Sequence, residues 1–164
     1  MPFDRIDRRI LTLLQSDGRI SNSELADAVG LSPSACLRRV RALEESGVIE
    51  RYVALLDQER IGRRMDIFVE ISLNSQSNEV LTAFEEAVAQ SPEIMECYLM
   101  AGDADYMLRI AAADPTHFEH IHRAHLTRLP GVSRMRSSFA IRTIAKSTAF
   151  PLPGPRQEPQ RDKG

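Results

Sequence analysis

The spacing of hydrophobic residues divides this 164-residue chain into a helical first third and a remainder that also contains strand patterns. Apolar residues recur every three to four positions in three stretches, which predicts helices over residues 4–15, 21–30 and 31–47. Ser21 and Glu24 have the spacing of a capping box at the start of the second helix. A short helix, a tight turn with glycine and a longer helix predict a helix-turn-helix unit.

The third predicted helix has two unlike faces. Ser32 suits its cap and Pro33 its first turn, and Gly47 suits its end. The face expected to be buried consists of Cys36, Leu37, Val40 and Leu43. The outward face consists of Ser34, Ala35, Arg38, Arg41 and Ala42. Small residues followed by arginines, with no acid before Glu44, suit a helix in the major groove of DNA. The alternative is an ordinary amphipathic helix whose charged face is solvated.

Two segments link the helices to the second half of the chain. Residues 48–56 are rich in β-formers and predict a two-stranded wing that turns near Glu50, with Arg51 in reach of a phosphate. A simple hairpin that covers the helices is an equally consistent interpretation. Residues 57–64 are polar and contain glycine, which predicts a hinge after a DNA-binding domain over residues 1–56.

The second half predicts an α+β domain. Alternating apolar residues and turn signals predict strands over residues 65–73, 94–101, 105–113 and 132–146, and helical spacing predicts helices over residues 77–90 and 115–129. The order β-α-β-β-α-β is that of a ferredoxin-like unit, expected over residues 65–150. Both helices would cover one face of the sheet, so a homodimer is the economical way to cover the other.

Composition narrows the function classes. The chain is 43% hydrophobic and 27% charged, as soluble globular proteins are, and contains no apolar run long enough to span a membrane. A charged N-terminus without a secretory segment predicts a cytoplasmic location. Residues 151–164, rich in proline and charge, predict a disordered tail. Residues 1–63 contain equal numbers of arginines and acids, so binding to nucleic acid must depend on where the charges lie.

The sequence contains no evident catalytic centre. Its histidines all lie on the last predicted helix: His117, His120, His122 and His125. Pairs three residues apart can ligate a transition metal, but packed rings at 122 and 125 and solvated rings at 117 and 120 are the simpler interpretation. Cys36 and Cys97 have no metal-ligand spacing and are expected to be reduced. We therefore expect no catalytic residue, metal or cofactor.

Several motifs carry a resemblance to a known family. They are DRRILTLLQSDGRISNSELADAVGLSPSACLRRVRALEESGVI, YVALLD, GDADYMLRI, RLPGV and SSFAIRTI, in that order. Together they resemble the Lrp/AsnC, or feast/famine, family of prokaryotic transcription regulators, and most closely a subgroup associated with amino-acid catabolism genes. The resemblance implies a winged helix-turn-helix domain joined to an effector-sensing domain. It also implies dimers that assemble further, often to octamers, and a small effector, usually an amino acid.

A DNA-binding role gives the third helix specific contacts. Arg38 and Arg41, one turn apart, are the candidates for base edges because arginine can donate two hydrogen bonds to guanine. Ser32, Ser34 and Arg39 are candidates for phosphate contacts that position the helix. A salt bridge to a nearby acid is an equally consistent role for Arg39. Because residues 1–63 have no net charge, a dimer that reads two half-sites about one helical turn apart is expected.

The effector site is assigned from the resemblance. The turn that contains Gly102, Asp103 and Asp105 corresponds to the family's GDxDY turn, where a carboxylate near exposed backbone N–H groups can hold both ends of a zwitterion. Asp105 would take the ammonium group. The remaining lining residues implied by the family are Tyr98, Pro115, Ser138, Phe139 and Ala140. The alternative is that the two aspartates only close a hairpin.

Two other functions remain open on the sequence alone. A few proteins that resemble this family are enzymes, the sirohaem decarboxylases, and the histidines of residues 117–125 are the feature that fits them. The outward arginines of the third helix argue against that function, because an enzyme has no use for them. An architectural DNA-binding protein without an effector is the third candidate, and it would show shallow sequence preference.

Overall fold

The computed structural model describes residues 4–152, so most of the predicted disordered tail, residues 153–164, lies outside the described residues. The chain divides into two compact units, one formed by the residues through Leu55 together with those from Ala145, and one formed by Leu56–Ile144. Each unit has its own hydrophobic core. No helix among the described residues is long and apolar enough to cross a membrane.

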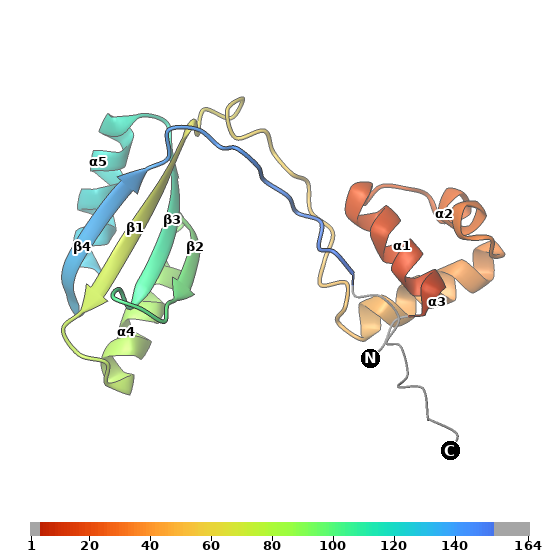
Figure 1. Ribbon diagram of the computed structural model, residues 1–164, viewed down its shortest axis with the longest axis horizontal. Helices are drawn as coiled ribbons and strands as arrows, with labels where there is room; N and C mark the ends of the chain where they lie inside the picture. Colours follow the sequence, from red (N-terminus) through yellow and green to blue (C-terminus); the bar gives the residue numbers. More distant parts are fainter. Residues whose placement is uncertain (1–3, 153–164) are drawn as a thin grey trace, which may run out of the picture. The chain divides into compact units, whose positions relative to one another are not determined.

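The first unit contains the three predicted helices (Figure 1). They are α1 (Arg5–Ser16), α2 (Asn22–Val29) and α3 (Pro33–Glu45). The expected caps are present: Asp4 accepts from backbone N–H groups of α1, Ser21 and Glu24 form the capping box of α2, and Ser32 accepts from Ala35 N. The sequence therefore determines these helix ends through local side-chain hydrogen bonds.

The core of this unit differs from the prediction at one position of α3. Its buried residues are Ile10, Leu11, Leu25, Ala26, Cys36 and Leu43. Leu37 was expected among them but is 38% exposed. The prediction was wrong there because the buried face of α3 is narrower than the apolar arc, and Leu37 lies at the edge of that arc.

The predicted two-stranded wing is absent: residues 48–56 contain no strand in the structure. A hairpin of such short strands is marginal in water without further packing, and Glu50-Arg51 lacks the Asn or Gly that favours tight hairpin turns. The segment is instead held near its middle, where the Tyr52 hydroxyl donates to Glu44 Oε1 over 3.0 Å. Val53 and Leu55 beyond it are 65% and 69% exposed.

The second unit is the predicted βαββαβ domain. Its elements are β1 (Met65–Leu73), α4 (Asn78–Ala89), β2 (Ile94–Leu99), β3 (Tyr106–Ala112), α5 (Pro115–Ala124), a short 3-10 turn (Leu126–Arg128) and β4 (Val132–Phe139). The strands form one antiparallel sheet in the order β2-β3-β1-β4. Both helices lie behind the same face of the sheet (Figure 1). The α+β class and the ferredoxin-like order are confirmed.

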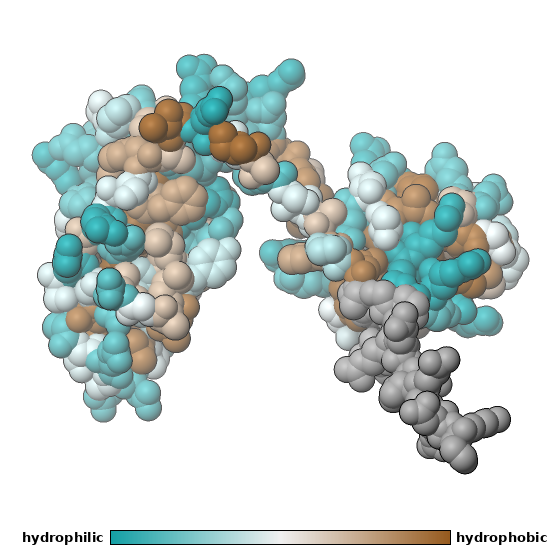
Figure 2. All heavy atoms as spheres, viewed as in Figure 1, coloured by the Kyte–Doolittle hydropathy of each residue, from teal (hydrophilic) through white to brown (hydrophobic). Residues whose placement is uncertain are grey.

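Alternation along the strands separates the two faces of the sheet. Ile67, Val69 and Ile71 of β1 are fully buried under α4 and α5, and Phe84 and Phe118 of these helices join the same core. Side chains between them in sequence point to the face that carries no helix, which we call the open face. Figure 2 shows apolar and weakly polar side chains along the middle of this face, with hydrophilic ones around them.

The last strand is shorter than predicted. It ends at Phe139, not at Lys146: its partner in the sheet, β1, begins at Met65, so in the observed register residues beyond 141 have no β1 residue opposite them. Ala140 N still donates to Asp66 O, after which the chain leaves the sheet. Residues from Ala145 are grouped with the first unit.

The segment 145–152, which we call the C-terminal strap, is fixed to the first unit by backbone and side-chain contacts. The Gln15 side chain accepts from Phe150 N over 2.6 Å and donates to Phe150 O over 3.2 Å. Leu152 packs against the core of the three helices. The Gln15 side-chain amide thus satisfies the backbone N–H and C=O of Phe150, which a neighbouring strand would satisfy in a sheet.

We expect Gln15→Ala to release the strap. Loss of two hydrogen bonds that each stabilise by about 1 kcal/mol should speed hydrogen exchange of the Phe150 amide at least fivefold. Exchange measured by mass spectrometry or NMR on the full chain tests this, with Gln90→Ala, an exposed position of the other unit, as the control. Unchanged exchange at Phe150 would show that the strap is held by other contacts.

Candidate DNA interface and effector site

The outward face of α3 carries a pair of exposed arginines. Arg38 and Arg41 lie three residues apart, and among residues 4–152 neither guanidinium forms a salt bridge. Ser34 is exposed one turn before Arg38, and Ala35 beside it is half-buried. On this face only small side chains precede the arginines, so the N-terminal half of the helix can approach another surface closely.

The third arginine of α3, Arg39, forms salt bridges within the first unit. One guanidinium nitrogen of Arg39, Nη1, lies 2.7 Å from a carboxylate oxygen of Asp4 and 2.7 Å from one of Asp7. A backbone hydrogen bond from Asp7 and the Arg39 hydrogen bond lower the pKa of the Asp4 carboxyl, opposed by partial desolvation. In the structure Arg39 thus forms a salt bridge, the alternative to its predicted phosphate contact, with Asp7 of α1 and with Asp4 at the N-cap of that helix.

The turn between α2 and α3 sets the position of the arginine pair. Gly30 ends α2 with a φ of 71°, a left-handed conformation that glycine adopts without strain. The Asn22 amide at the start of α2 donates to Pro33 O over 2.9 Å, which joins the first turns of both helices. Cys36 and Leu43 anchor the inner side of α3, and burial raises the pKa of the Cys36 thiol, so it stays protonated.

Three further predicted DNA contacts lie at the N-terminus of α3 and in the segment after the helix. The Ser32 hydroxyl caps the helix and lies 3.3 Å from the Ser34 hydroxyl, so both hydroxyls are grouped at its N-terminus. Arg51 follows the helix and is 73% exposed, with a loose contact of 3.7 Å to Glu50. Its side chain is accessible even though the wing that was expected to carry it is absent.

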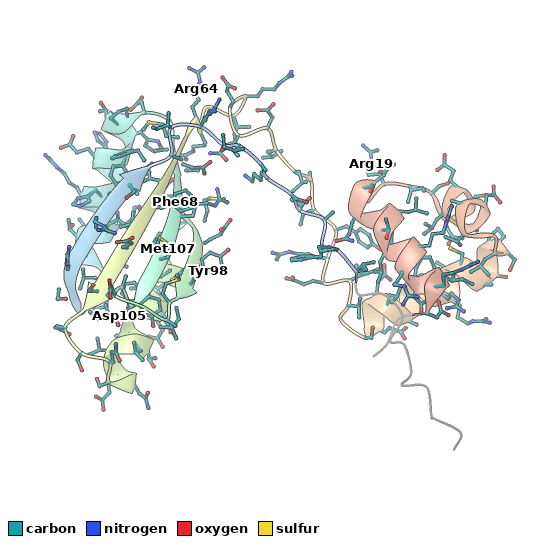
Figure 3. The ribbon with its side chains drawn as sticks, in the orientation of Figure 1. Arg19, Arg64, Phe68, Tyr98, Asp105 and Met107 are labelled. Atoms are coloured by element: carbon teal, nitrogen blue, oxygen red, sulfur yellow. The ribbon has the colours of Figure 1, made fainter. Side chains whose placement is uncertain are left out.

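The predicted effector residues fall into separate groups within one chain. Gly102, Asp103 and Asp105 lie in the turn next to the end of β1, where Asp105 N donates to Ile71 O. Ser138 pairs with Phe68 toward the start of β1, and Figure 3 shows Phe68 and Asp105 toward different ends of the sheet. Four residues of strand separate Ile67, the partner of Phe139, from Ile71, which is about 13 Å.

The other predicted lining residues follow the same division. Phe139 packs edge-on against Phe118 of α5, with ring centroids 5.4 Å apart, and Ala140 follows it. Pro115 starts the same helix, just after the end of β3 that pairs with Met65. Tyr98 lies on the open face opposite Met107 (Figure 3), and its hydroxyl donates to Glu96 over 2.8 Å. One copy of the chain does not bring all eight residues into one pocket.

Asp105 has a structural role that its prediction as an ammonium ligand did not include. One carboxylate oxygen accepts from Leu73 N over 2.7 Å, and the other accepts from Gln76 Nε2 over 2.7 Å. Its backbone also accepts from Met100 N. Because both oxygens are engaged, the structure supports the alternative for this residue, which is to close the turn. Asp103, in contrast, is exposed and forms no salt bridge within residues 4–152.

A charged network that the sequence reasoning missed lies on the open face. Arg109 of β3 reaches Asp66 of β1 at 2.9 Å and Glu96 of β2 at 2.6 Å, and its side chain is only 15% exposed. The three residues are cross-strand neighbours, since Arg109 pairs with both Phe68 and Glu96 in register. The signs of the charges alternate from β2 to β3 to β1. This pattern cannot be recognised in the sequence until the order of the strands in the sheet is known.

The histidines do not form a metal centre in the described residues, which contain no group of three or more metal-ligating side chains. His117, predicted to be solvated, is half-buried: its Nδ1 accepts from Ala113 N over 3.0 Å, and Arg63 Nη1 lies 2.9 Å from its Nε2. Arg63 in turn reaches Glu93 at 3.2 Å. His122 packs edge-on against Phe118, as expected for a packed ring.

The described geometry agrees with two family matches. Residues 66–150 match the Lrp/AsnC ligand binding domain, and residues 3–50 match a winged helix-turn-helix DNA-binding domain. The Bkd operon transcriptional regulator of Pseudomonas aeruginosa is 44% identical over 150 residues, covering 92% of this chain and 98% of the relative. The leucine-responsive regulatory protein of Escherichia coli K12 is 44% identical over 145 residues, covering 88% of each.

Solved structures lead to the same family. An AsnC family transcriptional regulator from Agrobacterium tumefaciens has a TM-score of 0.87 at 39% identity, covering 92% of this chain and 97% of its own. A Neisseria meningitidis transcriptional regulator, solved as a complex with L-Met, has a TM-score of 0.86 at 35% identity with the same coverage. These relatives are named as regulators and not as enzymes. The chain belongs to the Lrp/AsnC family and is a DNA-binding transcriptional regulator.

Proposed function

We propose that this protein binds specific sites in double-stranded DNA with α3 in the major groove and regulates genes of amino-acid metabolism in the cytoplasm. The observation that carries the proposal is the difference between the arginines of α3: Arg39 is bound by Asp4 and Asp7, whereas Arg38 and Arg41 form no salt bridge with any residue from 4 to 152 and are exposed on the outer face. Unpaired, exposed guanidinium groups lose little when they bind guanine. Ser32, Ser34 and Arg51 contact phosphates around them.

A homodimer supplies the second half-site. The open face supports this, because Phe68 and Met107 lie there beside the nearly buried Arg109, and a sheet face of this kind is covered when two copies pack together. Dimers assemble further, as far as octamers, and contacts between dimers bring the separated effector residues of different copies together.

An amino acid modulates DNA binding or assembly through the second unit. Two relatives support this: one is named a leucine-responsive regulatory protein, and another was solved with L-Met. The set Tyr98, Gly102, Asp103, Pro115, Ser138, Phe139 and Ala140 is divided between two ends of the sheet, so an effector that contacts both groups lies between copies. An effector that changes the dissociation constant for DNA by about fivefold or more would couple the two units detectably.

We expect Arg38→Ala and Arg41→Ala to weaken specific binding by about 1 to 3 kcal/mol each, because each removes contacts to a base edge. The probe is a duplex that the wild-type protein selects from random sequences, and a mobility-shift titration measures the affinity. Arg39→Ala is the matched control on the same helix, and it should lower thermal stability by loosening α1 while changing base preference little. Equal affinity of Arg38→Ala and wild type for the selected duplex would remove the assignment.

Arg51→Ala should act differently from the two base-reading variants. A phosphate contact carries no sequence information, so affinity should fall by the same factor for the selected duplex and for random DNA. The slope of log affinity against log salt should become shallower by about 1. Titrations at three salt concentrations measure both quantities, and a loss confined to the selected duplex would instead assign Arg51 to a base.

Phe68→Glu should disrupt the proposed dimer. The substitution puts a carboxylate near Asp66 and Glu70 on the open face, and two copies would bring such charges together without water. Light scattering after size-exclusion chromatography should show a smaller species than for the wild type. Thr82→Glu, on the exposed side of α4, is the control that should keep the wild-type mass. A wild-type mass for Phe68→Glu would place the dimer contact elsewhere.

A further inference from the structure

The outer face of α1 carries a second basic surface, apart from the arginines of α3. An open hollow of about 520 Å³ lies along it and is lined by Arg5, Arg9, Thr12 and Leu13. The first three of these residues are exposed, and Leu13 is half-buried against the helical core. Their spacing is that of one helix face, so the hollow is a groove about two turns, or about 12 Å, long. We call it the α1 groove.

The arginines of the α1 groove are not neutralised by the residues that the structure describes. Within residues 4–152 neither Arg5 nor Arg9 forms a salt bridge. Arg9 Nε donates to Ala28 O over 3.0 Å, which attaches its guanidinium to the end of α2 without removing its charge. The nearest acids along the chain, Asp4 and Asp7, are both bound to an arginine of α3. The groove therefore keeps two positive charges.

Arg5 occupies a position where helix stability alone does not favour a cation. It is the first residue of α1, directly after the N-cap Asp4. The free N–H groups of a first turn carry partial positive charge, so an acid there stabilises the helix and a base opposes it. Asp7 in the same turn follows this rule, and Arg5 does not. A local preference that is broken without a compensating partner in the unit indicates a partner outside it.

The α1 groove faces away from α3. Arg39 of α3 contacts Asp4 and Asp7, so these two acids mark the side of α1 that lies against α3. At 100° per residue, the groove is centred about 150° around α1 from that side. A duplex in contact with the outward arginines of α3 therefore lies on another side of the unit. The groove stays available while the protein is bound to DNA.

We propose that the α1 groove docks an acidic helix of a partner protein, with two carboxylates on Arg5 and Arg9 and an apolar side chain on Leu13. Charge complementarity selects this occupant, because each guanidinium can donate two charge-assisted hydrogen bonds to a carboxylate. The groove is open along two turns and far larger than the roughly 30 Å³ of one water molecule, so it suits a chain segment and not a small ion. Residues 153–164 of this chain contain more bases than acids and do not complement it.

A synthetic helical peptide tests the docking. The probe is a short labelled peptide with two glutamates four positions apart and a leucine four positions farther on, which matches the spacing of Arg5, Arg9 and Leu13. The control peptide has glutamine at both glutamate positions. Fluorescence anisotropy on the full chain at low salt should show at least fivefold tighter binding of the glutamate peptide. Equal affinity for the two peptides would overturn the proposal.

Variants separate the α1 groove from the DNA interface. Arg5→Gln combined with Arg9→Gln should weaken peptide binding at least fivefold and leave the affinity for the selected duplex unchanged. Arg38→Gln combined with Arg41→Gln should do the reverse. Arg5→Gln alone should weaken peptide binding without lowering the thermal unfolding temperature, because it removes a cation from a helix N-terminus. This variant therefore distinguishes lost docking from lost folding.

Three results would assign the α1 groove differently and overturn the docking of an acidic helix. Equal peptide binding by the two double variants would place the peptide elsewhere on the chain. An equal loss of affinity for selected and random duplexes in the α1 double variant would make the groove a phosphate contact. A smaller mass of that variant in light scattering would assign the groove to a second copy of this chain.

Discussion

The sheet unit has helices on one face only, and that constraint governs most of what the second half of the chain does. The inward side chains of β1, among them Ile67, Val69 and Ile71, pack in the core under α4 and α5, so the alternate side chains face the opposite side of the sheet. On a solvated surface those positions would be simply polar. Here Arg109 is 15% exposed and paired with two carboxylates, an arrangement whose disruption would leave a charge partly buried without a partner. Such a paired, partly buried charge fits the proposed dimer contact on this face.

The same face carries two kinds of surface. Toward its middle, Phe68 and Met107 lie among the Arg109 pairs, which suits contact with another protein surface. Toward the end of β1, the side chains are polar and the face is hollowed between Glu70, Arg134 and Asp103. The register of β4 against β1 produces this difference, since it places Arg136 opposite Glu70 and Arg134 opposite Ser72. The proposed dimer contact and the polar hollow therefore occupy different parts of one sheet face.

Local signals in the sequence predicted most of the fold. Helix ends in the first unit follow from caps such as Ser21 and Ser32, whose hydrogen bonds involve residues three positions away. Strand order and the buried face follow from alternation in β1 and from the βαββαβ sequence of elements. The errors lie where pairing with a distant segment determines the structure: β4 pairs with β1 no farther than Phe139, and residues 48–56 form no strand. Periodicity carries no information about either partner.

The candidate DNA and effector sites also contain some residues that the local sequence predicts and others whose role depends on distant partners. The outward arginines of α3 were predictable because the apolar residues of the helix determine which side is buried, and Arg38 and Arg41 lie on the opposite side. The role of Arg39 was ambiguous because its partners, Asp4 and Asp7, lie more than 30 residues away in the sequence. The family resemblance placed the effector near Asp103 and Asp105, but only the hydrogen bonds of Asp105 to Leu73 and Gln76 separate a turn-closing aspartate from an accessible one. In the sequence, Arg134 and Arg136 resemble ordinary exposed strand residues. Only the register of β4 against β1 shows that Arg136 lies opposite Glu70 and Arg134 opposite Ser72.

The C-terminal strap changes how the two units are connected. The chain passes between them twice, once near Leu55 and again near Ala145, and the second passage ends in the core of the three helices at Leu152. A DNA-binding unit cut at residue 56 would lack the Gln15–Phe150 hydrogen bonds and part of its packing. β4, whose Arg134 and Arg136 line the hollow, is joined to the strap by residues 140–144. Under the proposed effector function, a ligand that restrains β4 would act on a strand that the chain connects to a segment hydrogen-bonded to α1, which is a covalent route between the units other than residues 56–64.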